Sequence, residues 1–395
     1  MNVAVVTSLF PSCERPREGI FAERRWQAFS ERGHGVRIIQ PIPWSPPGMP
    51  GARAEYRRMA RKTERNGLAV QRPVYPHLPG GLGAWASILN ARQFARVARR
   101  AVLHERPDVV VLDYAWPAAE LVTGIDLPCV VSGRGSDVLA VAEDAALAPR
   151  LARALRHAAG YFAVSEHLAE AMDELSGLAG TGILIANGVD MGRFTPGPRG
   201  PARAELGLPG EGPLVGVVGH LIPRKDPLLA LECFLRAAPP DARLVFVGRG
   251  ELEPALRRSI AAAGAEERVS LLGEFPPQRL ANLYRALDVL LLTSSREGRP
   301  NVVLEAFASG TPVVATPAGG TPELFEGVDL GLARDRSIEA LSDALSAVLD
   351  RPPPAEQLKG AVAPRTWDAC ASQIEQLLNS LLDRAAANRE SSRDN

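Results

Sequence analysis

The sequence predicts an α/β protein of two doubly wound domains, each a parallel sheet with helices on both faces. The chain has 395 residues, which is more than one hydrophobic core usually spans. Short β-branched runs alternate with helical segments along nearly its whole length, as they do in parallel sheets. One stretch rich in Pro, Gly and Arg, residues 196–213, interrupts this alternation and is the best linker candidate.

The first domain is expected to span residues 1–195. A helix is expected over Ile20–Arg32, because aromatic residues recur there at helical spacing, and Gly33 ends it. Ser165 is placed to cap the helix that follows the last strand. The strands of this domain are expected at Val3–Val6, Val36–Ile39, Val109–Leu112, Val130–Ser132 and Tyr161–Val164.

The second domain is expected to span residues 214–366, followed by a helix over 367–387 that packs back toward the first domain and a disordered polar tail over 388–395. Two such sheets are expected to face a central cleft, lined by the loops that follow the strands. The strands of the second domain are expected at Val215–Val218, Leu244–Val247, Val269–Leu272, Val289–Leu292 and Val313–Ala315.

Composition favours a cytoplasmic protein. The chain is 46% hydrophobic and 23% charged, which is ordinary for a soluble α/β fold. Its four cysteines are scattered without a C-x-x-C pair, so we expect reduced thiols and no zinc site. Residues 1–10 lack a basic leader region, and no uncharged apolar run approaches the ~18 residues of a membrane span. Secretion and membrane spanning are therefore not expected.

Charge is balanced overall and uneven locally. The chain has 45 basic and 45 acidic residues, which gives no case for nucleic acid. Residues 53–106, however, hold twelve basic side chains against three acidic ones. Two interpretations stay open for this region: peripheral contact with an anionic membrane, and an ordinary solvated helix surface.

Two glutamates flank a predicted anion site after the strand that ends at Leu292. Glu297 lies in the loop, and a helix is expected to begin near Asn301, where unpaired amides suit a phosphate. Glu305, about one turn into that helix, could reach a ribose hydroxyl, and Glu297 could reach sugar hydroxyls. The helix-start residues expected at the donor are Asn301, Val302 and Val303.

A glycine and two bases follow the first strand of the second domain. Gly219 is followed by the pair Arg224 and Lys225. Arginine can form two bonds to a diphosphate, and lysine adds a mobile point charge. Together they would stabilise the charge that develops on a leaving diphosphate. The alternative is a solvated basic turn.

These two segments together resemble the retaining GT-B glycosyltransferases of family 4. In that family the first glutamate of an E-x7-E motif, here Glu297, holds the donor sugar, and the second, here Glu305, holds the ribose. The family's basic pair binds the donor diphosphate. The resemblance implies a GT-B fold, a UDP or GDP sugar as co-substrate, and retention of anomeric configuration. His220 stands where an arginine is common in the family.

Smaller matches follow in the family's order. Gly248 resembles a strand-end glycine turn near the base, and Phe275 ends a second base-facing strand. Residues 317–323 resemble a loop whose backbone approaches the donor, although Thr321 before a proline would also suit an ordinary helix start. In the first domain, Gly19 resembles the family's glycine loop beneath the donor, where backbone comes close to phosphate.

Residues 132–137 resemble the family's R-G-x-D segment on the acceptor side. The resemblance implies that Arg134 and Asp137 orient the acceptor, while Asp137 could instead be a helix N-cap. Residues 185–190 resemble the crossover between domains and are interpreted as a hinge. The residues expected to carry catalysis are Glu297, Arg224, Lys225 and Asp137.

Absent motifs narrow the chemistry. The sequence contains no D-x-D, H-E-x-x-H or G-x-x-x-x-G-K-[ST] pattern, so protein cations are expected to hold the phosphates without a metal or a cofactor. We expect the acceptor to attack the face that the leaving group vacates, with the departing phosphate as base and domain closure excluding water. The acceptor could be a glycan, a lipid carrier or a small molecule, and the enzyme could sit at the inner face of the membrane.

Three other functions stay open. The first is a nucleotide-sugar 2-epimerase on the same architecture, which the E-x7-E and Arg-Lys pairing fits less well. The second is a dinucleotide-dependent oxidoreductase, for which residues 215–220 are only a partial glycine fingerprint. The third is a non-catalytic nucleotide-sugar binding protein, which Glu297, Glu305, Arg224 and Lys225 argue against.

Overall fold

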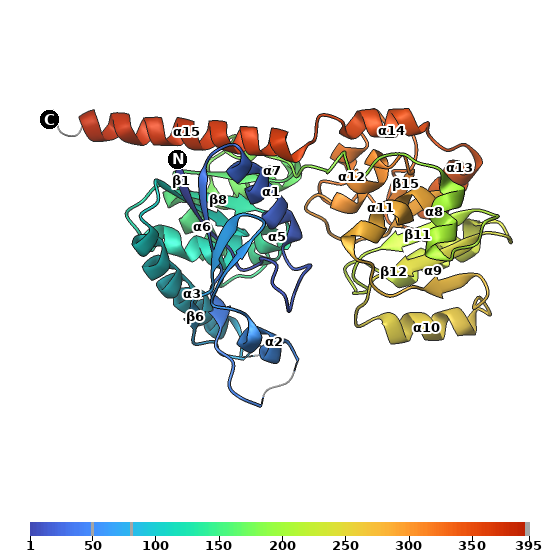
Figure 1. The fold of residues 1–395 in the computed structure, drawn as a ribbon, viewed down its shortest axis with the longest axis horizontal. Helices are drawn as coiled ribbons and strands as arrows, with labels where there is room; N and C mark the ends of the chain where they lie inside the picture. The colour runs from blue at the N-terminus through green and yellow to red at the C-terminus, as the bar shows by residue number, and fades with distance from the viewer. Residues whose placement is uncertain (49–50, 80–81, 392–395) are drawn as a thin grey trace. The chain divides into compact units, whose positions relative to one another are not determined.

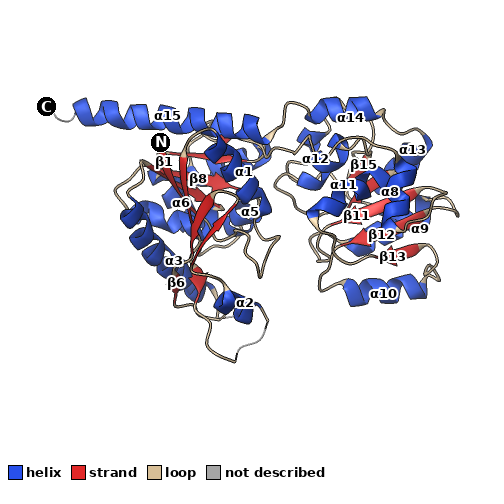
Figure 2. Cartoon of the chain, viewed as in Figure 1, coloured by secondary structure: helices blue, strands red, loops and turns tan. Residues whose placement is uncertain are grey.

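The computed structural model describes residues 1–48, 51–79 and 82–391. The chain divides into two compact units, the first formed by Met1–Asn187 with Trp367–Asn395 and the second by Gly188–Thr366. The division therefore falls at Asn187, within the segment interpreted as a hinge, so that residues 188–195 belong to the second unit. In each unit, strands lie between layers of helices (Figure 2).

The first unit is built on an eight-stranded sheet in the order β10-β9-β8-β7-β1-β2-β5-β4. Every pair is parallel except β4 with β5, which is antiparallel and lies at the edge. Two short strands, β3 (Ile42–Pro43) and β6 (Val74–Tyr75), form a separate pair. The strands of the main sheet are β1 (Asn2–Val6), β2 (Gly35–Ile39), β4 (Lys62–Arg65), β5 (Leu68–Gln71), β7 (Val109–Asp113), β8 (Cys129–Gly133), β9 (Gly160–Ala163) and β10 (Ile183–Leu184).

Helices cover both faces of this sheet because successive strand residues point to opposite sides. Val3 and Val5 pack with α1 (Ile20–Glu31) and α15 (Trp367–Ser391), whereas Ala4 and Val6 pack with α3 (Ala84–Glu105). The α3 face also holds α4 (Ala115–Ala118), η1 (Ala119–Gly124), α5 (Ser136–Ala142), α6 (Ala148–His157) and α7 (Glu166–Ser176). The Ser165 hydroxyl accepts from the Leu168 amide at 3.3 Å, which confirms the predicted cap of α7.

The sequence analysis missed the hairpin of β4 and β5. Asn66 and Gly67 connect these strands with φ values of 48° and 76°. Positive φ at both positions is the signature of the type I′ turns that suit two-residue hairpins, and Asn-Gly is their preferred sequence. The Asn-Gly pair could therefore have predicted this hairpin from the sequence. The helix α2 (Ala52–Arg58) precedes this hairpin.

The second unit is a five-stranded parallel sheet in the order β13-β12-β11-β14-β15. Each strand begins and ends within one residue of its predicted bounds. The strands are β11 (Leu214–Val218), β12 (Arg243–Val247), β13 (Val269–Leu271), β14 (Val289–Leu292) and β15 (Val313–Ala315). One face packs against α9 (Pro227–Ala237), α10 (Glu253–Ala262) and α13 (Ile338–Asp350), and the other against α8 (Arg199–Leu206), α11 (Pro277–Ala286), α12 (Asn301–Ala308) and α14 (Ala355–Val362).

The predicted linker 196–213 is wrong as a linker, because it contains α8. Pro198 precedes this helix, and Gly207 ends it in the left-handed conformation with φ of 66°. The buried Arg203 guanidinium donates to the Ala286 carbonyl at 3.0 Å and to Asp288 at 2.6 Å. Proline and glycine at these positions mark the two ends of a helix and do not make the chain flexible. The segment is therefore an integral part of the second unit.

The C-terminal helix belongs to the first unit (Figure 1). Its residues Cys370, Ile374 and Leu378 are buried against the face of the sheet that carries Val3 and Val5. Helix α15 continues through Ser391, so the tail predicted from residue 388 is helical over its first four residues. Residues 392–395 lie outside the described part of the chain.

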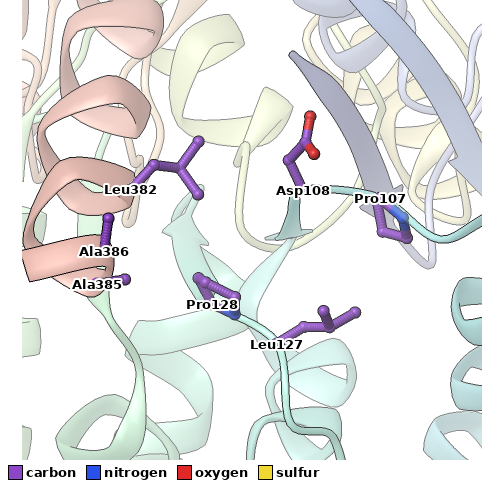
Figure 3. Close-up of a pocket in the computed structure, with 7 residues that line it drawn as sticks. All are labelled: Pro107, Asp108, Leu127, Pro128, Leu382, Ala385 and Ala386. Atoms are coloured by element: carbon purple, nitrogen blue, oxygen red, sulfur yellow. The ribbon is translucent and has the colours of Figure 1, made fainter. Parts of the chain in front are cut away.

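A shallow groove of about 370 Å³ lies beside α15 (Figure 3). It is lined by Pro107, Asp108, Leu127, Pro128, Leu382, Ala385 and Ala386. The first four of these residues precede β7 and β8, so the groove lies at the amino ends of the strands. This is the edge of the sheet opposite to the one where α/β proteins place their ligands.

The described helices include none that is both long enough and apolar enough to cross a membrane. All four cysteines are free thiols, with Cys13 exposed and the other three buried.

Candidate active site

The second sheet has a topological switch point between β11 and β14. From β11 the sheet continues to β12 and β13 on one side, and β14 and β15 lie on the other. Open α/β sheets bind ligands at the carboxyl ends of the strands that flank such a point. Both segments singled out in the sequence follow these two strands, with Lys225 after β11 and Glu297 after β14.

Hydrogen bonds join the two loops directly. The Ser295 amide donates to the Arg224 carbonyl at 2.8 Å, and the Thr293 hydroxyl donates to the carbonyls of Lys225 and Asp226 at 3.0 and 2.8 Å. Asp226, with φ of 46°, then caps α9 by accepting from the Leu229 amide at 3.2 Å. The basic turn and the glutamate loop therefore form one structure.

Glu297 is the centre of this structure. Its Oε1 lies 2.5 Å from the Lys225 ammonium, and its Oε2 lies 3.5 Å from the Arg224 guanidinium. The Glu297 side chain is only 8% exposed, and this burial alone would raise its pKa, but Lys225 and Arg224 outweigh it and hold the pKa below the usual value. The site thus holds an ionised carboxylate beside two cations, of which Arg224 is 39% exposed.

Glu305 is half-buried and has a neutral partner. It projects from α12 and accepts a hydrogen bond of 2.8 Å from the hydroxyl of Tyr284 on α11. Burial raises its pKa to about 7, against the smaller opposing effects of the Tyr284 hydroxyl and the charge of Arg193. Asn301 and Val302 begin α12 and are half-buried, while the Val303 side chain is fully buried in the core. Val303 could therefore meet a ligand only through its backbone.

Glycines allow the backbones of the neighbouring loops to come into close contact. The Gly219 amide donates to the Val247 carbonyl at 3.0 Å, and the Gly248 amide donates to the Gly273 carbonyl at 2.8 Å. A Cβ at Gly248 would lie 1.8 Å from the Gly219 carbonyl oxygen, which no side chain allows. Gly219 and Gly248 thus have a packing role independent of any ligand. Phe275 is 7% exposed, and its ring lies 4.2 Å from the Arg279 guanidinium.

A second clamp holds the loop after β15 against the Glu297 loop. The Gly320 amide donates to the Gly298 carbonyl at 3.0 Å, and the buried Arg299 guanidinium lies 3.1 Å from Glu323. Thr321 precedes the 3-10 turn η2 (Pro322–Leu324) without a side-chain cap bond, so the ordinary helix start with a Thr321 cap is not what the structure shows. The Arg299–Glu323 pair was not identified from the sequence.

The first unit has its own switch point between β1 and β7, and a buried charged network lies beside it. Asp113, the last residue of β7, accepts from Arg134 at 2.8 and 3.0 Å and from the Trp26 indole at 2.7 Å. Arg134 and Arg25 both donate to the Asn187 side-chain oxygen, at 2.9 and 2.7 Å. Burial, followed by the charge of Arg134, lowers the pKa of Arg25 to about 10. Of these residues, sequence analysis had assigned a side-chain role only to Arg134.

Asp137 is an anchor for the backbone. Its carboxylate is 3% exposed and accepts from the amide of Ala115 at 2.6 Å and from that of Arg134 at 3.0 Å. Burial raises its pKa to about 6. Asp137 lies within α5, whose N-cap is Gly135, so it is not the predicted N-cap either. Both of its oxygens accept from backbone amides, which fits a residue that positions the loops after β7 and β8.

Gly19 also has a local structural role. It precedes α1 with φ of 73°, and a Cβ there would lie 2.5 Å from the Leu9 carbonyl oxygen. The backbone that leaves no room for a side chain at Gly19 therefore belongs to the same loop as Gly19. Of the predicted site residues, Lys225, Arg224 and Glu297 come together within the second unit, and Arg134 and Asp137 come together within the first.

Two family descriptions match consecutive parts of the chain. Residues 19–188 match "Glycosyl transferase 4-like domain", and residues 199–365 match "Glycosyl transferases group 1". The chain is 28% identical over 358 residues to TuaC of Bacillus subtilis, a proposed teichuronic acid biosynthesis glycosyltransferase, and the match covers 88% of each chain.

Solved structures share the fold. Sucrose-phosphate synthase from Thermosynechococcus elongatus superposes with a TM-score of 0.78 and 20% identity over 97% of this chain and all (100%) of that chain. HepE of Anabaena in complex with UDP-glucose superposes with a TM-score of 0.72 and 21% identity, covering 96% of this chain and 100% of that chain.

The raised pKa of Glu305 makes stability depend on pH. Because its folded pKa of about 7 lies above the ordinary 4.5, the folded protein should lose stability as pH rises through this interval, by up to roughly 3 kcal/mol. Glu305→Gln should remove this loss, so its stability relative to the unsubstituted protein should increase from pH 5 to pH 8. Urea unfolding across this range measures it, with the exposed Glu266→Gln as control. Parallel pH profiles for Glu305→Gln and the parent protein would contradict the prediction.

Breaking the Arg299–Glu323 pair should destabilise the second unit. Arg299→Glu places two carboxylates together in a buried position and should lower the free energy of unfolding by about 3 kcal/mol. The double exchange Arg299→Glu with Glu323→Arg should recover part of that loss, because opposite charges face each other again. Urea unfolding of the three variants is the measurement. A double variant no more stable than Arg299→Glu alone would show that the pairing is not the cause.

Proposed function

The chain belongs to the glycosyl transferases group 1 family and is a hexosyltransferase-type glycosyltransferase with the GT-B fold, and from this premise we propose its reaction. We propose that it moves a hexose from a UDP or GDP sugar to a glycan, lipid-carrier or small-molecule acceptor, with retention of configuration. The observation that carries this proposal is the contact of Glu297 with Lys225 and Arg224 at the switch point of the second sheet.

The cluster has the chemistry that a nucleotide-diphosphate sugar needs. An ammonium has three donors, so Lys225 can keep Glu297 and still donate to a phosphate. The half-exposed Arg224 can bind a second phosphate oxygen, and the amides that begin α12 can bind another. These groups would stabilise the diphosphate as it departs. Glu297, ionised and fixed by its two cations, would accept hydrogen bonds from the sugar hydroxyls, and Glu305 would bind the ribose.

The remaining parts of the proposal concern the reaction course. Protein cations take the place of a metal, and no cofactor is required. The acceptor attacks the face that the leaving group vacates, and the departing phosphate takes its proton. Arg134, held by Asp113, and the loops that Asp137 positions would form the acceptor side. Closure of the two domains around the donor would exclude water and stays a prediction. The enzyme acts in the cytoplasm, with peripheral membrane contact through residues 53–106.

Removing either member of the central pair should abolish most turnover. Lys225→Ala and Glu297→Gln should each lower kcat about 100-fold or more, because a preorganised charge is lost at the diphosphate or the sugar. Initial rates of hexose transfer measure this, and circular dichroism should show an intact fold. The exposed Arg258→Ala on α10 is the matched control and should keep full activity. Near-normal transfer by both site variants would remove the proposed mechanism.

Donor identity can be read from thermal stability. The correct UDP, GDP or ADP sugar should raise the melting temperature, since a ligand at 100 times its Kd stabilises the folded state by about 2.7 kcal/mol. Lys225→Ala should lose this shift. Incubating the stabilising donor without acceptor tests the alternative 2-epimerase, because an epimer would appear in that mixture and an intact donor would support transfer. A rise in melting temperature with NAD alone would favour an oxidoreductase.

A further inference from the structure

The solvent face of α3 carries an unusual set of side chains. At about 100° per residue, seven exposed residues of this helix fall within an arc of roughly 100°. They are Trp85, Leu89, Arg92, Arg96, Arg99, Arg100 and Leu103, which we call the α3 stripe.

Packing fixes the direction of the stripe. The opposite side of α3 is buried in the core of the first unit, where Phe94, Ala98 and Val102 pack against the sheet. The helix therefore cannot turn its arginines inward, and α3 lies at the outside of the unit in Figure 1. The stripe is a permanent feature of the surface.

The four arginines of the stripe are not neutralised. Across residues 1–48, 51–79 and 82–391, no carboxylate lies within ion-pair distance of any of them. The single acidic residue of α3 is Glu105, and it pairs with Arg37 at 3.4 Å. The stripe thus presents four positive charges with no internal partner.

Four other bases of the 53–106 region have partners within the protein. Arg53 donates to the Trp44 carbonyl at 3.1 Å, and Arg57 donates to the Pro46 carbonyl at 2.8 Å. Arg65 pairs with Glu23, and Arg72 is buried against Gln40. Arg58, Arg61 and Lys62 are exposed elsewhere in this region, and α3 carries four further arginines on one face.

Apolar side chains flank these charges on the same face, with Trp85 and Leu89 before the arginines and Leu103 after them. Trp85 is 58% exposed, Leu103 is 48% exposed and Leu89 is 38% exposed. Tryptophan prefers the boundary between headgroups and acyl chains, and arginine is attracted to anionic headgroups. Four arginines flanked by Trp and Leu on one helix face therefore match a lipid surface.

We propose that α3 lies flat on an anionic phospholipid surface, with the α3 stripe as the contact. A polyanion such as nucleic acid would bind the arginines, but it would give Trp85 and the leucines no apolar surface to contact. A second copy of this chain would bring arginine against arginine, which opposes self-association. The biological role of this contact rests on the proposed function, because a membrane-bound transferase would meet a lipid-linked acceptor there. Vesicle binding itself needs no turnover and can be measured separately.

The test is co-sedimentation of the full chain with vesicles in the absence of donor. Vesicles of phosphatidylcholine with 30% phosphatidylglycerol should bind at least tenfold more protein than pure phosphatidylcholine, and 0.5 M salt should release it. The double variant Arg92→Glu with Arg96→Glu should lose at least tenfold of this binding, and Trp85→Ser should weaken it. The matched control, Arg257→Glu with Arg258→Glu on α10, changes the same charge on exposed arginines of the second unit and should bind like the parent.

Equal binding by the parent and the α3 double variant would overturn the proposal, as would equal binding to both kinds of vesicle. Capture by polynucleotide with no vesicle binding, or a dimer that the α3 variant dissolves, would also overturn it. The donor-induced rise in melting temperature, measured on the same variants, keeps the two hypotheses apart. A retained rise without vesicle binding refutes only the membrane surface, and vesicle binding without any donor response refutes only the transferase.

Discussion

The contact between Glu297 and the cations Lys225 and Arg224 is the interaction on which the site depends. A parallel sheet brings the loops after β11 and β14 to one edge, but it does not fix their side chains. The buried carboxylate of Glu297 fixes them, because burial disfavours its charge and the cations beside it offset that cost. The cluster of Glu297, Lys225 and Arg224 that orders the two loops also has one positive charge in excess, which suits an anionic ligand.

The first unit repeats this arrangement with different residues. Asp113 is buried at the carboxyl end of β7, and two arginines, Arg134 and Arg25, lie in its network. Again two cations accompany one carboxylate, and the excess charge is held at the carboxyl edge of a sheet. Here, however, Asn187 and Trp26 also join the network, so the charges are tied to the end of the unit at Asn187 and to α1. The arrangement therefore holds Arg134 more rigidly than the exposed Arg224 is held.

Regular elements were readable from the sequence, and long-range contacts were not. β14 and β15 were predicted to the residue because their apolar runs are continuous, as buried parallel strands require. The linker prediction failed because composition cannot tell a helix bounded by Pro198 and Gly207 from a flexible segment. The role of Asp137 depends on the Ala115 amide, 22 residues away in the chain, and no local motif shows which amide will arrive there.

The two glutamates of the E-x7-E pattern show what the spacing of residues in the sequence can and cannot predict about their roles. Their positions predicted that Glu297 and Glu305 flank one site and meet the sugar and the ribose respectively, but they predicted no difference in the ionisation of the two carboxyl groups. In the structure the cations beside Glu297 lower its pKa, whereas burial beside the neutral Tyr284 raises that of Glu305 to about 7. Environments that separate two pKa values assign separate roles. Glu297 is suited only to accept hydrogen bonds, while Glu305 can donate or accept near neutral pH, which matches the paired hydroxyls of a ribose.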